Sequence, residues 1–337
     1  MNTAPVEIIK EIASNLTLVD LLNFSLADRR AWACSRRFVL QHVATLNTTS
    51  CLSEFEELLS SRNFPTRQLS IYHGTWPACA RDDWETHPLQ VADAHRSIFS
   101  TRGRRAASDE MARQAFDAYY SFIKEERLRN NEYDQAQLER VLSYLPRLEK
   151  ITISSLIRKR LGRLGKAKLS GLRQKIRMSP TMFDSVGSLV ESLFRVLPSF
   201  HQIHSVHIES KLLDFPPPCR LEGVRELEIS ALSLITPKLQ SFVGFMKSFP
   251  NLERLSVAPY HPLGLVFPLA DIYYPRLHSV VFSECWVSKV DFIDFVKRHT
   301  ELKSLRLEGV LLSDCSWRPV LSALEKVQCT IELIDCK

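Results

Sequence analysis

The segment Phe249-Pro250-Asn251-Leu252-Glu253-Arg254-Leu255-Ser256-Val257 holds the pattern that decides the fold. A short turn containing Pro250 is followed by apolar residues at Leu252, Leu255 and Val257. Leu255 and Val257 alternate with polar neighbours, as in a β-strand that buries one face. The proline fixes the backbone angle φ of the turn that leads into the strand. The sequence therefore predicts a short, half-buried strand at this point.

The same pattern recurs along the chain. Similar turns begin at Leu145, Tyr274 and His299. The apolar triplets are Leu148/Ile151/Ile153, Ile203/Val206/Ile208, Val224/Leu227/Ile229, Leu252/Leu255/Val257, Leu277/Val280/Phe282 and Leu302/Leu305/Leu307, with Ile331/Leu333 as a weaker last member. From Ile203 onward the triplets begin 21, 28, 25 and 25 residues apart. Spacings of about 20 to 29 residues are typical of leucine-rich repeats.

Helical spacing of apolar residues fills most of the gaps between these strands. The stripes are Leu138/Val141/Leu142/Leu145, Met182/Val186/Leu189/Val190/Leu193/Leu197, Leu239/Phe242/Val243/Met246, Val290/Ile293/Val296 and Val320/Leu321/Leu324. The gap 258–273 is rich in proline and predicts a loop. Parallel strands need crossover connections, so the expected class is α/β: an irregular solenoid with a parallel sheet on one face and helices and loops on the other.

The first 45 residues have a different pattern, with three short amphipathic stripes. The first is Pro5/Ile8/Ile9/Ile12/Leu16, the second Leu18/Leu21/Leu22/Leu26 and the third Trp32/Val39/Leu40/Val43. Thr17 with Asp20 resembles a helix-capping box between the first two. Three helices in so short a segment bury too little surface to be stable alone, so we expect them to pack on a partner.

These residues carry a resemblance to a known motif. Residues 4–9 (Ala-Pro-Val-Glu-Ile-Ile), Ile12, Leu16, Asp20, Leu21, Leu22 and Leu26 look like the F-box. The resemblance implies a three-helix module that binds a Skp-type adaptor and, through it, the cullin scaffold of an SCF ubiquitin ligase. The candidate contact residues are Pro5, Ile8, Ile9, Ile12, Leu16, Leu18, Leu21, Leu22 and Leu26. The alternative is that these helices only cap the rest of the fold.

Most of the remaining chain also bears a loose resemblance to a family. The segments 119–126 and 145–151 resemble fungal proteins that combine an F-box with leucine-rich repeats. This implies a protein-interaction role and no catalytic residues. The expected divisions are residues 1–46, an F-box-like module; 47–145, a linker with a first strand at Gln68–Ile71 and long helices; and 146–337, the repeat array with a basic insertion at 156–180.

Strand alternation predicts which side chains face outward from the sheet. One row is His207, Glu228, Ser256, Val281 and Arg306, and the other is Ser205, Glu226, Arg254, Ser279 and Ser304. The candidate substrate surface is His207, Glu228, Arg254, Ser256, Ser279, Ser304 and Arg306. Its mixed chemistry favours a protein partner over nucleic acid. For any one of these residues, a merely solvated side chain is an equal alternative.

The net charge of +6 is localised, because residues 156–177 contain nine Lys or Arg and no acidic residue, which leaves 6 − 9 = −3 elsewhere. This segment is expected to be a solvated insertion loop, with a nuclear-import signal second and an RNA contact last, since no aromatic residues interleave with it. Eight scattered cysteines without zinc-ligand spacing indicate reduced thiols in the cytoplasm or nucleus. No secretion signal or membrane span is expected.

The sequence was also compared with the motifs of catalytic and metal sites. His201, His204 and His207 lie close together, but strand alternation separates the last two, so surface histidines are favoured over a metal site. Trp76, Cys79 and Trp84 are expected to anchor a loop rather than to form a nucleophilic site. We therefore expect no enzyme, no cofactor and no metal. The expected function is a substrate receptor of a ubiquitin ligase that marks proteins for degradation; the alternative is a repeat scaffold outside a ligase, nuclear or associated with nucleic acid.

Overall fold

The protein is an α/β fold built on one long parallel sheet, seen here in a computed structural model. The structure describes residues 4–16, 24–27, 29–61, 64–86, 103–156, 163–180, 187–234, 236–260, 266–313, 316–325 and 327–336. Eleven α-helices lie within these residues. None of the helices in this part of the chain is long and apolar enough to cross a membrane.

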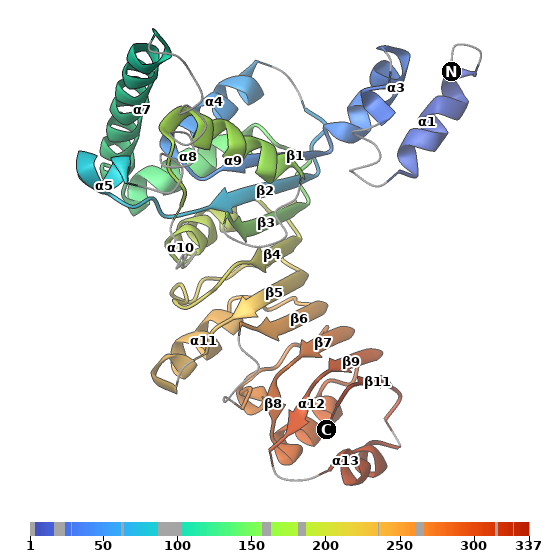
Figure 1. Ribbon diagram of the computed structural model, residues 1–337. Coiled ribbons are helices and arrows are strands. Elements are labelled where there is room, and N and C mark those ends of the chain that lie inside the picture. The colour runs from blue at the N-terminus through green and yellow to red at the C-terminus, as the bar shows by residue number, and fades with distance from the viewer. Residues whose placement is uncertain are drawn as a thin grey trace.

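Nine strands form the sheet and follow one another in chain order. They are β1 (His42–Leu46), β2 (Gln68–His73), β3 (Lys150–Ser155), β4 (Ser205–Glu209), β5 (Glu226–Leu232), β6 (Arg254–Pro259), β7 (Ser279–Ser283), β9 (Ser304–Glu308) and β11 (Thr330–Ile334). Two short strands, β8 (Trp286–Val287) and β10 (Leu311–Leu312), pair separately. Figure 1 shows the strands stacked like rungs, with the N-terminal helices beside β1 at one end.

The turn predicted before each strand is present and explains the even stacking. The backbone N–H of Leu252 donates to the carbonyl of Phe249 at 3.3 Å, and the equivalent bonds precede β3, β7 and β9. The next two N–H groups then share one carbonyl of the preceding repeat: those of Glu253 and Arg254 donate to Arg225 O at 2.8 and 2.9 Å. Because this unit recurs, each new strand is placed in register on the last.

One face of the sheet is covered by helices. Alternate strand residues such as Leu255, Val257, Leu305 and Leu307 are buried in one continuous apolar cluster. The helices that pack on it are α4 (Thr49–Ser60), α8 (Asn131–Ser143), α10 (Gly187–Val196), α11 (Leu239–Met246), α12 (Lys289–Arg298) and α13 (Trp317–Leu324), with short 3₁₀ turns at Leu197–Ser199, Thr236–Lys238 and Leu269–Asp271. Helices therefore occur at the predicted positions, except that Met182 and Val186 lie outside the described residues. The described part of the proline-rich gap contains the end of β6 and the last of these 3₁₀ turns.

Among the described residues, helices cover the opposite face at its N-terminal end. Here α5 (Arg81–Glu85), α7 (Gly103–Arg127) and α9 (Arg163–Ile176) surround a second apolar cluster with Leu46 and Tyr72 of the sheet. Trp84 and Tyr119 are almost completely buried in it. The prediction of a solvated basic loop is wrong for α9, because Leu169, Leu172 and Ile176 are buried within this cluster. Their spacing places them on one side of the helix, and Lys175, on another side, is exposed.

The predicted boundary between the N-terminal module and the repeats also needs correction. The first helix is α1 (Val6–Ser14), and the third stripe begins as a helix, α3 (Arg29–Val39). Val43, assigned by the sequence to this third helix, lies in β1, which pairs with β2. The sheet therefore begins at His42 rather than after residue 46. The predicted second helix falls mainly on residues 17–23, outside the described residues.

Candidate binding surfaces

The N-terminal helix pair, α1 and α3, carries the first candidate surface. The two helices pack against each other, with Ile9 and Ala13 of α1 buried alongside Ala31 and Cys34 of α3. A guanidinium N–H of Arg30 also donates to the carbonyl of Ala4, which fixes the start of α1. The pair lies to one side of β1, at the end of the sheet (Figure 1). The side chains buried between α1 and α3 therefore need no partner from another protein.

The outer side of the pair is apolar and open. Pro5 is exposed, and the exposed fractions of Ile8 and Ile12 are 52% and 46%. These three residues occupy positions i, i+3 and i+7, so they form one stripe along α1. Leu26, at 75% exposed, and Trp32, at 43%, add apolar surface from the following segment. An exposed group of this kind on a small unit is typical of a protein-interaction site.

The structure divides the predicted adaptor contacts into four groups. Pro5, Ile8, Ile12 and Leu26 are exposed, while Leu16 is half-buried. Ile9 was predicted to contact the adaptor directly, but the structure buries it between α1 and α3, so its side chain is not free to do so. Leu18, Leu21 and Leu22 lie outside the described residues. Trp32 was not among the predicted contacts, although its place in the third apolar stripe could have indicated it.

The open face of the sheet is the second candidate surface. Strand pairing places the two predicted rows side by side and in register, and β3 adds Lys150 to one and Thr152 to the other. The first row is then Lys150, Ser205, Glu226, Arg254, Ser279 and Ser304, and the second is Thr152, His207, Glu228, Ser256, Val281 and Arg306. Arg254, Ser304 and Arg306 are exposed, and the remaining predicted contacts are half-buried. Whether these side chains bind a partner stays a prediction.

Charge is distributed unevenly over this face. On β4 and β5, the His207 ring lies 2.7 Å from a carboxylate oxygen of Glu228 and 3.6 Å from one of Glu209. The hydrogen bond with His207 is the main cause that lowers the pKa of Glu228. On β9, Arg306 pairs with Glu308 at 2.6 Å. Between these two charged regions, β6 presents Arg254 and Ser256, and β7 presents Ser279 and Val281, so the face is mixed in charge.

A third candidate is a polar network at the carboxyl ends of β1 and β2, centred on Arg129. The guanidinium donates to Asp134 Oδ1 from Nε and from Nη2, at 2.8 and 2.6 Å. It also donates to Glu126 Oε2, and to the backbone and side-chain oxygens of Asn47, each at 2.8 Å. An arginine guanidinium has five N–H donors, and all five are therefore hydrogen-bonded.

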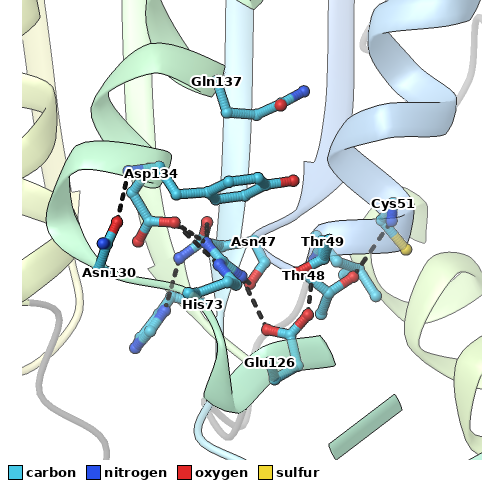
Figure 2. Close-up of polar contacts among 12 residues, drawn as sticks. Asn47, Thr48, Thr49, Cys51, His73, Glu126, Asn130, Asp134 and Gln137 are labelled. Carbon is cyan, nitrogen blue, oxygen red and sulfur yellow. Dashed lines mark hydrogen bonds and ion pairs between the residues drawn. The ribbon is translucent and has the colours of Figure 1, made fainter. Parts of the chain in front are cut away.

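Neighbouring residues extend this network into the surrounding helices, as Figure 2 shows. Glu126 also accepts the backbone N–H of Thr49 at the start of α4, and Asn47 bonds to the ring of His73. Burial acts to lower the pKa of Arg129, but Glu126 and Asp134 outweigh it and the pKa is raised. The network borders a cavity of about 370 Å³. Because its charged groups already satisfy one another, we assign it to joining β1, α4, α7 and α8. Nothing in the sequence pattern had indicated it.

Two clusters considered from the sequence have their contacts within the chain. His207 is held by glutamates, and no group of three or more metal-ligating side chains occurs among the described residues. The hydroxyl of Tyr119 donates to Pro77 O and accepts the N–H of Cys79, and Trp84 donates to Ile176 O. These bonds tie the loop that contains Cys79 to α7 and α9, which is the anchoring role predicted for it. Burial is the main cause that raises the pKa of Tyr119 to about 12.

Comparison with known proteins gives no further information on function. A scan against protein-family models found no match, and a search of curated proteins found none either. The argument for function therefore depends on the residues and their geometry.

Proposed function

We propose that this chain is a non-catalytic substrate receptor of an SCF-type ubiquitin ligase. In this proposal the N-terminal helix pair binds a Skp-type adaptor, and the open face of the curved sheet, read as an irregular leucine-rich-repeat solenoid, binds the protein to be ubiquitinated. The chain would act by positioning: it raises the effective concentration of its target near the ubiquitin donor. The chemistry would take place on other subunits, in the cytoplasm or nucleus.

The observation that carries the proposal is the apolar stripe of Pro5, Ile8 and Ile12. A helix that faces only water does not keep three apolar residues on its outer side, because burial of each isoleucine side chain is worth about 1.5–3 kcal/mol. Ile9 and Ala13 already hold α1 on α3, so the outer stripe is not needed for that contact. An amphipathic helix docked in an apolar groove would use residues at this spacing.

The test is binding of the full chain to a purified Skp-type adaptor, measured by calorimetry. The double substitution Ile8→Asp with Ile12→Asp should weaken binding about 30-fold if one anchor dominates and about 700-fold if the two losses add, because each anchor in such a contact is worth about 2 kcal/mol. Both side chains are about half exposed, so the variant should keep its fold, which circular dichroism would check. The control is Val290→Asp on α12, where a valine that is 69% exposed lies far along the chain and should leave binding unchanged.

A second variant separates direct contact from folding of the pair. Ile9→Asp should also abolish binding, but by separating α1 from α3, and hydrogen exchange of α1 should then rise; the Ile8/Ile12 variant should leave that exchange as it is. Equal adaptor binding by wild type and the Ile8/Ile12 variant would remove the ligase proposal. A repeat scaffold that acts outside a ligase would then remain.

A further inference from the structure

The last strand of the sheet, β11, has one edge free among the residues that the structure describes. Its other edge pairs with β9, where the N–H of Thr330 donates to Lys303 O at 2.9 Å and Gly309 donates to Ile334 O at 2.7 Å. Since successive residues of a strand direct their backbone groups to opposite sides, those of Ile331 and Leu333 point to the free edge. This edge can accept another strand.

The apolar side chains at this edge are only partly covered. Leu305 and Leu307 of β9, and Val310 two residues after it, are completely buried, because the next repeat packs on them. The equivalent residues of the last repeat are Ile331, Leu333 and Cys336, and these are only half-buried against the same core. The apolar cluster therefore continues to the edge and would be extended by a further pair of apolar side chains.

Charge at the edge indicates what the added strand would carry. Glu332 lies between Ile331 and Leu333 and points to the open face, with 56% of its side chain exposed. Arg306, its neighbour on β9, is 3.8 Å away and is itself bound more closely to Glu308 at 2.6 Å. The carboxylate of Glu332 is thus left with capacity for a second cation on its outer side, where a residue of the added strand would lie.

We propose that the free edge of β11 binds an extended peptide as a tenth strand. The peptide would place a lysine or arginine beside Glu332, with an apolar residue on each side of it next to Ile331 and Leu333. Backbone bonds supply the affinity and the alternating side chains supply the selectivity, as in other strand additions. The apolar-basic-apolar pattern is the same in both directions, so the proposal holds for parallel and antiparallel addition.

A second copy of this chain fits the edge less well. Two β11 strands related by a twofold axis through the pair would bring Glu332 opposite Glu332, and like charges directly opposite destabilise a sheet. Addition of β1 from another copy would place Ala44 beside Glu332, with no charge to meet it. The helix pair also stands on the outer side of β1 (Figure 1). The carboxylate therefore favours a basic peptide.

The first test uses the full chain and two fluorescent nine-residue peptides, identical except for a central Ile-Lys-Ile or Ile-Glu-Ile. Fluorescence anisotropy should show saturable binding of the lysine peptide, with the glutamate peptide about fivefold weaker or worse. Glu332→Lys should reverse this preference. The matched control, Glu325→Lys, makes the same charge change at an exposed position at the end of α13 and should preserve it.

The second test asks whether the peptide binds through its backbone. Methylation of alternate peptide nitrogens on one edge should abolish binding, while methylation of the other edge should be tolerated, because only one edge faces β11. The proposal is overturned if both methylated peptides bind like the parent, if neither parent peptide binds, or if Glu332→Lys leaves the lysine preference unchanged. Dimerisation in light scattering that Glu332→Lys alters would instead assign the edge to a second copy.

Discussion

The two ends of the sheet are held together by different means. At the C-terminal end, β7, β9 and β11 begin at residues 279, 304 and 330, so the repeats are nearly equal in length and each contributes the same turn and apolar residues at the same positions. At the N-terminal end, residues 74–149 separate β2 from β3 and include α5, α7 and α8. The C-terminal repeats are stabilised by one set of contacts that recurs in each repeat. The N-terminal end depends on contacts that occur at one place only.

The Arg129 network gives the largest expected difference between the two ends. Arg129→Met would leave Glu126 and Asp134, with only 16% and 14% of their side chains exposed, without their cation. Loss of one partner of a buried ion pair costs about 3–5 kcal/mol, so the free energy of unfolding in urea should fall by that amount. The control is Arg225→Met, whose partner Glu253 belongs to an exposed pair and whose loss should cost about 1 kcal/mol or less.

A triple variant tests the physical reason for that loss. If the cost of Arg129→Met arises from the two unpaired carboxylates, then adding Glu126→Gln and Asp134→Asn should restore part of the stability, because the amides are neutral. No recovery would indicate that the geometry of the guanidinium bonds matters more than charge. Equal losses from Arg129→Met and Arg225→Met would contradict the contrast between the two ends.

The same contrast explains how much of the fold could be predicted. The C-terminal strands were predictable because Leu255, Val280 and Leu305 recur at an even spacing, and a repeated signal is strong even when each instance is short. Val43 of β1 was assigned to a helix because the apolar residues Val39, Leu40 and Val43 fit a helical spacing. Leu169, Leu172 and Ile176 have helical spacing, but α9 was predicted as a loop. The nine Lys or Arg residues of segment 156–177 indicated a solvated segment more strongly than these three apolar residues indicated a buried helix.

The candidate surfaces were predictable to different degrees for similar reasons. Strand alternation is a geometric rule, so it placed His207 beside Glu228 and Arg254 beside Ser279 without knowledge of the structure. No comparable rule states which side of an amphipathic helix faces its own chain. The stripe of Ile9 and Ala13 and the stripe of Pro5, Ile8 and Ile12 are both apolar, and only packing on α3 distinguishes them.

A pH-dependent effect of intermediate size is expected from His299, in the turn before β9. Its ring donates from Nδ1 to Phe295 O and accepts the N–H of Tyr274 at Nε2, with 3.0 Å between the nitrogens. Burial is the main cause that lowers the pKa of His299. The folded chain therefore binds fewer protons than the unfolded chain, and the stability from this group is present above the unfolded pKa and is lost as the pH falls below it.

The comparison between pH 7.5 and pH 5.5 should show this loss most clearly near β7 and β9. Protonation removes the acceptor for Tyr274, a hydrogen bond worth about 1 kcal/mol, and adds a buried charge. Because the intrinsic exchange rate of an amide itself falls with pH in this range, the quantity to compare is the protection factor. Protection of the β9 amides should therefore decrease at the lower pH in the wild type. In His299→Gln this loss of protection should be much smaller, while protection in β1 and β2 should respond to pH as before, because His42 there is unchanged. An identical response in the variant would exclude His299 as its source.

The smallest effect should come from the residue directly after each of β7, β9 and β11, where three repeats share one backbone conformation. Glu284, Gly309 and Asp335 have φ of 51°, 61° and 52°, a region that costs a residue with a side chain about 1–2 kcal/mol. At Gly309 an added Cβ would meet Glu284 Cγ at 3.5 Å, an ordinary contact, so the cost of Gly309→Ala should come from the backbone alone.

We expect Gly309→Ala to lower the free energy of unfolding by about 1 kcal/mol and Glu284→Gly to raise it by about 0.5 kcal/mol, the gain being reduced by the greater entropy of glycine in the unfolded chain. Urea titrations of both variants would measure this. Two shifts of the same sign would show that contacts of the Glu284 side chain, such as that with Gly309, outweigh its strained backbone, and that the repeats are less interchangeable than their shared conformation indicates.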